Sequence, residues 1–136
     1  MEPKPQSRPR FGNGRTYESA DMKLWKRQFI QHLKRKRFKK IESGPIAVCV
    51  TFYVKPPLRI SKAKTKNPLT NQQLEKVFVD KKPDLDNYLK AVWDSCNGIL
   101  YKDDGQIAVT TAQKLYSNNP RIYLEIFELE EEKCSI

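Results

Sequence analysis

Four aspartates stand in two close pairs, Asp84 with Asp86 and Asp103 with Asp104, in a chain whose formal net charge is +10. Two carboxylates about 4 Å apart repel by roughly 4 kcal/mol at an effective dielectric near 20, so such groups usually serve a purpose. The common purpose is a hard divalent cation, which takes oxygen ligands and activates water beside a phosphate. Basic surface with an acidic cluster is typical of a metal-dependent nuclease.

Two neighbouring residues extend this candidate site. Lys90 follows Asp86 by four residues, on the same face of a predicted helix. Beside a phosphodiester, its ammonium could stabilise charge on the transition-state oxygens or on the leaving group. Asn87 could supply an amide that orients a carboxylate.

A purely structural interpretation of the same residues is also open. Asp84 could serve as a helix N-cap, and Asp86 could complement the helix dipole. Lys90 could form ordinary i,i+4 pairs with Asp86 and Asp94, each worth about 0.2–0.5 kcal/mol. Against this interpretation, Asp86 is a second carboxylate where one would suffice, and Asp103 with Asp104 adds two more. We therefore expect the two acidic pairs to converge on one shared cation.

The elements before the candidate site are predicted from periodicity and turn residues. Prolines and glycines make residues 1–19 an extended basic arm. Asp21 is expected to cap a helix that runs to about Phe38, because Trp25, Phe29 and Leu33 recur at helical spacing. Residues 46–54 alternate between apolar and mixed positions, which predicts a strand with one apolar face. Residues 55–82 follow as a basic flexible loop.

The site itself falls on the second half of the chain. A second helix is expected to begin near Asp84 and to stop at Asn97 and Gly98. Two strands follow, at about 106–116 and 121–129, and residues 117–120 predict a hairpin between them. Residues 130–136 form an acidic tail. The order helix, strand, helix, strand, strand predicts one α+β domain over residues 1–136.

Charge is unevenly distributed along the chain. Residues 1–82 hold 21 Lys and Arg against 6 Asp and Glu, whereas residues 83–136 hold 5 against 10. The first part predicts a polyanionic partner, although basic runs are often only solvated faces. The candidate nucleic-acid contacts are the basic residues Arg8, Arg10, Lys62, Lys64, Lys66, Lys81 and Lys82.

Cysteine and histidine usage excludes several other classes. Cys49, Cys96 and Cys134 are odd in number and widely spaced, which predicts neither a disulfide framework nor a zinc site. His32 is the single histidine, so we expect no histidine metal site and no histidine base. The chain has neither a long apolar run nor an apolar segment near Met1. A reducing, cytoplasmic location is expected.

The segment from Lys81 to Ile107 resembles the RusA family of Holliday junction resolvases. The resemblance rests on two ordered motifs, Lys82-Pro83-Asp84-Leu85-Asp86-Asn87 and Tyr101-Lys102-Asp103-Asp104-Gly105-Gln106-Ile107. Lys90-Ala91-Val92, Asp94 and Asn97-Gly98 lie between them at matching spacing. Upstream, Arg8-Pro9-Arg10 and Tyr17 resemble that family's Arg-Pro-Arg segment. Such a long motif is far more specific than an isolated pair of aspartates.

The resemblance implies a fold, a partner and a set of roles. It implies a small α+β homodimer in which a single-layer mixed sheet packs with two helices. It also implies cleavage of two opposed strands of four-way junction DNA with Mg²⁺ or Mn²⁺, in a bacterial or phage-encoded protein. Asp84, Asp86 and Asp104 fall on the family's essential carboxylates, and Lys90 on its essential lysine. Asp103 matches the preceding acidic position and is a possible further ligand.

Three hypotheses for function follow. The leading one is a Mg²⁺-dependent endodeoxyribonuclease that resolves Holliday junctions in recombination and repair. The second is a metal nuclease that acts on flaps, forks or other branched DNA. The third is a non-catalytic basic module that binds nucleic acid, in which the acidic residues only cap and pair.

Overall fold

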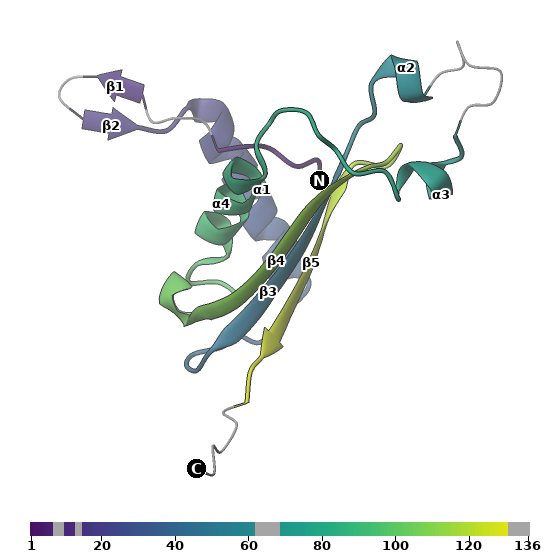
Figure 1. Ribbon diagram of the computed structural model, residues 1–136. Helices are drawn as coiled ribbons and strands as arrows, with labels where there is room; N and C mark the ends of the chain where they lie inside the picture. The colour runs from purple at the N-terminus through teal and green to yellow at the C-terminus, as the bar shows by residue number, and fades with distance from the viewer. Residues whose placement is uncertain (7–9, 13–14, 62–68, 131–136) are drawn as a thin grey trace.

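A computed structural model describes residues 1–6, 10–12, 15–61 and 69–130 (Figure 1). Its main elements are helix α1 (Ala20–Arg35), strand β3 (Ile46–Val54), helix α4 (Leu85–Cys96) and strands β4 (Ile107–Tyr116) and β5 (Arg121–Glu128). Smaller elements are strands β1 (Arg10–Gly12) and β2 (Arg15–Tyr17), helices α2 (Leu58–Ser61) and α3 (Asn71–Leu74), and the 3₁₀ turn η1 (Asp104–Gln106). The α+β prediction is confirmed.

β3 is the central strand of a three-stranded mixed sheet. The strand order is β4-β3-β5, with β4 parallel and β5 antiparallel to β3. The predicted hairpin between residues 106–116 and 121–129 is therefore wrong, because β3 lies between the two strands. The physical reason is that β3 carries the most apolar face and is paired along both edges, as a buried central strand requires.

Two helices cover one face of this sheet (Figure 1). Ile46, Val48, Val50 and Phe52 alternate along β3 and are all buried. They belong to one core cluster with Trp25 and Phe29 of α1 and with Tyr88 and Val92 of α4. Because α4 carries the first acidic pair, this core positions the candidate site. The ring of Tyr88 stacks on Phe52 at 5.2 Å between centroids, which joins α4 directly to the central strand.

The described parts of residues 55–82 hold more structure than the predicted loop. α3 begins with a capping box between Thr70 and Gln73. Glu75, just after α3, accepts hydrogen bonds from Arg121 at 2.9 Å and from Ser117 at 2.7 Å. These bonds attach the segment to the ends of β4 and β5. Within the described residues, we find no helix long and apolar enough to cross a membrane.

Candidate active site

The first acidic pair lies at the N-terminus of α4. Asp84 has the extended backbone of an N-cap, yet its side chain makes no capping hydrogen bond. Asp86 accepts a hydrogen bond from the backbone N–H of Asn87 at 2.9 Å. Both aspartates are exposed, and neither has a Lys or Arg partner within the described residues. The capping role proposed for Asp84 is not realised, so its carboxylate is available to a ligand.

Lys90 likewise has no ion-pair partner among the described residues. It is exposed on α4, and among the described residues it forms no ion pair with Asp86 or Asp94. Asp94 pairs instead with Lys26 of α1, with 3.3 Å between Nζ and Oδ2. The pairing that would give Lys90 a merely structural role is therefore absent from this part of the molecule. The carbonyl of Asn87 accepts a hydrogen bond from the backbone N–H of Gln6 at 2.9 Å, which attaches the N-terminal segment to the start of α4.

The second acidic pair lies in the turn that precedes β4. Asp103 caps η1 by accepting from the backbone N–H of Gly105 at 3.0 Å, and Gln106 completes the capping box. A Cβ on Gly105 would lie 2.9 Å from Asp103 Oδ2, so a larger residue there would make the Asp103 carboxylate move. Gln106 also donates to the carbonyls of Ile41 and Gly44. These bonds fix the turn, while the carboxylate of Asp104 stays exposed.

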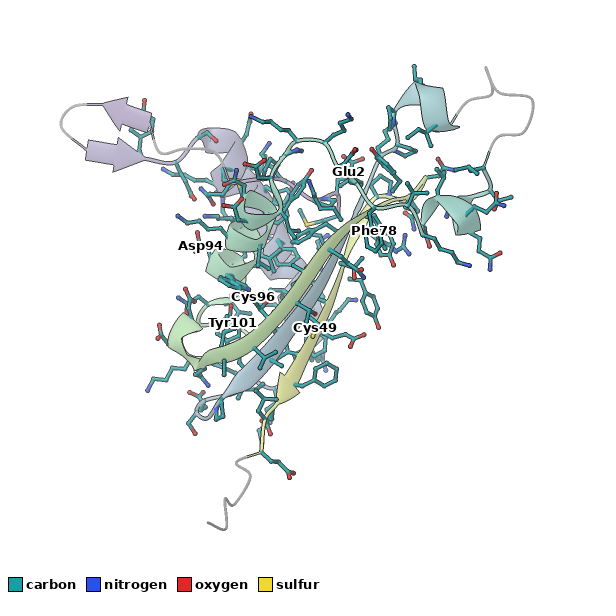
Figure 2. All side chains as sticks on the ribbon, viewed as in Figure 1. Glu2, Cys49, Phe78, Asp94, Cys96 and Tyr101 are labelled. Carbon is teal, nitrogen blue, oxygen red and sulfur yellow. The ribbon has the colours of Figure 1, made fainter. Side chains whose placement is uncertain are left out.

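The carboxyl of Asp104 has an unusual electrostatic environment. Partial desolvation raises its pKa above the usual value, and the charges of Asp103 and Asp94 raise it further. Burial raises the pKa of the Cys96 thiol to about 12, and the charge of Asp104 adds to the rise in pKa at both Cys96 and Tyr101. Figure 2 shows Asp94, Cys96 and Tyr101 around the C-terminal end of α4. Asp104 has no Lys or Arg partner among the described residues, and a cation would stabilise a carboxylate held among like charges.

Replacing Asp104 should therefore stabilise the free protein. A carboxyl whose pKa is raised by folding favours the protonated form, so its ionised form costs stability at neutral pH. We expect Asp104→Asn to raise the melting temperature by about 1–3 °C at pH 7. The gain should shrink as pH falls through the raised pKa, and it should vanish below the ordinary aspartate pKa, where the folded and unfolded states are both protonated. Asp80→Asn, at an exposed carboxylate, is the control. A lower melting temperature for Asp104→Asn at pH 7 would contradict the prediction.

The two acidic pairs lie at opposite ends of α4. The helix has 12 residues, which corresponds to about 18 Å. The segment before α4 is held to the end of β4, because Lys114 Nζ donates to the carbonyls of Lys81 and Pro83 at 2.8 Å each. Asp104 instead precedes the start of β4 at Ile107, about 23 Å away along the strand. Figure 1 shows the segment before α4 and the turn η1, which contains Asp104, at opposite ends of the sheet.

The described part of one chain therefore does not bring the two acidic pairs together at the shared cation site that we expected. Among the described residues, no three His, Cys, Asp or Glu side chains lie close enough to hold one ion. Asp84 and Asp86 form one candidate half of such a site, and Asp103 and Asp104 form another. The sequence could not reveal this separation, because it depends on the direction in which α4 runs across the sheet.

The predicted DNA contacts are only partly within the described residues. Lys81 and Lys82 are exposed and line a cleft beside the first acidic pair. Arg8, Lys62, Lys64 and Lys66 lie outside the described residues, as does the side chain of Arg10. The nucleic-acid role of these five residues therefore stays a prediction.

Sequence reasoning missed Lys114, although a signal was present. In register, Lys114 lies opposite the buried Phe52 and shares the helix-facing side of β4 with Ala112 and Tyr116. A lysine at a core-facing position of a strand is unusual, because burying a charge costs free energy unless it finds partners. Here the partners are the carbonyls of Lys81 and Pro83, directly before Asp84. Lys114 thus fixes the chain that presents the first acidic pair.

Comparison with known proteins identifies the family. A model of the family "Endodeoxyribonuclease RusA" matches residues 1–127. The chain is also 33% identical over 132 residues to "Uncharacterized protein YqaN" of Bacillus subtilis (strain 168), a match that covers 94% of this chain and 92% of that relative. The resemblance seen between Lys81 and Ile107 is thereby confirmed over most of the chain. This protein belongs to the RusA family of endodeoxyribonucleases.

Proposed function

We propose that this protein is a Mg²⁺-dependent resolvase that makes paired nicks in opposed strands of four-way DNA junctions. The observation that carries the proposal is that functional side chains at the start of α4 have no structural partners among the described residues. These side chains lie within residues 1–127, which the family model matches. Asp84 makes no capping bond and Lys90 makes no ion pair within the described part of the chain. Side chains left free by the fold are available to a substrate and an ion.

Each side chain has a task that follows from its chemistry. Asp84 and Asp86 would provide oxygen ligands for Mg²⁺, with Mn²⁺ as a substitute. An ion held there supplies polarisation of the phosphate and a lowered pKa for water. Lys90 lies one helical turn from Asp86 and would stabilise negative charge that develops on the phosphate oxygens. Its exposure leaves it free to reach a strand that lies along α4.

The separation of the two acidic pairs leads us to propose that two copies of the chain complete each site. Within one chain they lie at opposite ends of α4, so a site that uses both pairs needs a second subunit. An antiparallel two-fold arrangement would place the start of α4 from one copy beside the Asp103–Asp104 turn of the other, twice. Two equivalent sites would suit symmetric nicking of a junction. The homodimer is thus part of the proposed mechanism.

The substrate preference can be tested by competition. Wild-type protein is incubated with a labelled fixed four-way junction, Mg²⁺ and increasing unlabelled junction, flap, fork or linear duplex of equal length. We expect the unlabelled junction to suppress cleavage at far lower concentration than the other forms, because junction shape directs binding through phosphate contacts. Preferential suppression by a flap or fork would instead favour the second hypothesis, a nuclease for other branched DNA.

A binding role without catalysis remains the alternative from another class. It would require the acidic residues to act only as caps and pair partners, and only Asp103 is a cap of that kind among the four aspartates. Absence of metal-dependent cleavage on every branched substrate, with binding retained, would support this alternative.

A further inference from the structure

A cleft beside the first acidic pair is lined by lysines from separate segments. Its volume is about 370 Å³. Lys55 follows β3, Lys81 and Lys82 precede α4, and Lys114 lies in β4. Pro83, which adjoins Asp84 in the chain, also lines it. The cleft therefore opens next to the residues proposed to act on a phosphate.

The positive charge of this cleft is not neutralised by the described residues. None of its four lysines lies within 4 Å of a carboxylate oxygen in that part of the chain. Among the described residues, Glu2 is the single acidic residue in the lining. In Figure 2 it lies at the end of the sheet opposite Tyr101. An excess of cationic groups around one hollow attracts an anion, and the attraction is strongest where the walls exclude water.

Lys114 connects the cleft to the first acidic pair. Two of the three N–H groups of its ammonium are used by the carbonyls of Lys81 and Pro83. The third has no acceptor among the described residues and could donate to an oxygen in the cleft. An anion held there would therefore contact the same ammonium that fixes the chain before Asp84.

The remaining walls suit a sugar and its phosphate. Val54 and Pro57 are partly exposed and supply apolar surface, and the almost fully buried Tyr88 and Tyr116 complete the lining. A volume of about 370 Å³ lies within the range of about 300–1,000 Å³ seen for small-molecule sites, and it exceeds what one phosphate needs. The cleft thus fits a nucleotide unit whose phosphate meets the lysines.

We propose that this cleft binds a backbone phosphate of the DNA strand next to the phosphate that is cut, with Lys55 and Lys114 as its principal contacts. The proposal rests on the proposed nuclease function and adds a subsite to it. Lys55 provides charge alone, whereas Lys114 provides charge and also positions the segment that carries Asp84 and Asp86. The cleft would set the register of the strand relative to the first acidic pair.

The experiment compares lysine variants on DNA with single neutral linkages. Junctions carry one methylphosphonate at successive positions around the mapped cut, and binding is measured in chelator across a range of salt. We expect one position to weaken binding by wild type several-fold and to have no further effect on Lys55→Gln. The salt slope of Lys55→Gln should be shallower by about one unit, as for one lost phosphate contact.

Several variants separate this role from a general loss of charge. Lys55→Arg should keep the response to the neutral linkage, because it keeps the cation. Lys23→Gln, at an exposed lysine of α1 outside the cleft, should respond as wild type does. Lys114→Gln should lose the response to the linkage and also lower the cleavage rate of bound DNA, because it releases two carbonyls before Asp84.

Two failures can be told apart. If wild type cuts the unmodified junction but every linkage affects Lys55→Gln and wild type equally, the subsite is wrong and the nuclease function stands. If wild type cuts no branched DNA, the proposed function itself fails.

Discussion

Asp86→Asn protein is expected to lose cleavage of a four-way junction by on the order of a thousandfold, while junction binding in chelator is retained. Asp86 is exposed and accepts one hydrogen bond, from the backbone N–H of Asn87. Asparagine keeps the shape but loses the charge that a divalent cation needs. Cleavage of labelled junction under single-turnover conditions measures the loss, and a gel-shift assay measures binding. Cleavage at the wild-type rate would show that Asp86 is not a ligand of the proposed metal ion.

A mixture of two inactive variants tests the proposed assembly of the site. Asp86→Asn and Asp104→Asn proteins should each be inactive alone. If each site combines the start of α4 from one subunit with the Asp103–Asp104 turn of the other, mixed dimers contain one site with both pairs intact. An equimolar mixture, allowed to exchange subunits, should then regain nicking of one strand. A mixture of Asp84→Asn with Asp86→Asn is the control, because both changes fall in the same half-site and no recovery is expected.

Phe52→Ala is expected to lower the free energy of unfolding by about 3–5 kcal/mol, a large part of the stability of a small domain. Phe52 is fully buried in the central strand, and its ring stacks on Tyr88 of α4. Its removal leaves a cavity between the sheet and the helix that carries the candidate site. Urea denaturation monitored by circular dichroism measures the change.

Phe78→Ala provides a matched control for the same loss of ring. Phe78 is 70% exposed, and Figure 2 shows it away from the packed helices. Its bridge to Leu115 is made by the backbone and survives the substitution. We expect a change within about 0.5 kcal/mol. An equal loss of stability in both variants would show that the core between β3 and α4 is not what stabilises the fold.

The sequence predicted the main elements well, because local patterns determine them. The predicted strand 46–54 coincides with β3, since its alternation reflects one buried face. Gly98 was expected to end the second helix, and it follows α4 with φ of 79°, a left-handed conformation that glycine adopts readily. The first helix is capped by Ser19 rather than by Asp21, and it ends at Arg35 rather than near Phe38. Arg35 to Lys40 are all charged or exposed, so no buried contact extends the helix.

Long-range arrangement was not predictable from these patterns. The insertion of β3 between β4 and β5 depends on a crossover through α4, and the residues 117–120 connection gives no sign of it. The separation of Asp86 from Asp104 follows from the same crossover. By contrast, the resemblance over residues 81–107 identified the family correctly. The order and spacing of motifs can be compared directly in the sequence, without knowledge of the tertiary structure.

Cleavage of a fixed four-way junction by the wild-type protein, with and without Mg²⁺, tests the central claim most directly. Each of the four strands is labelled in turn, so that every nick is mapped. We predict nicks at symmetric positions in two opposed strands when Mg²⁺ or Mn²⁺ is present, and none in chelator. Intact strands under all these conditions, with the junction demonstrably bound, would contradict the proposal that this chain is a metal-dependent junction resolvase.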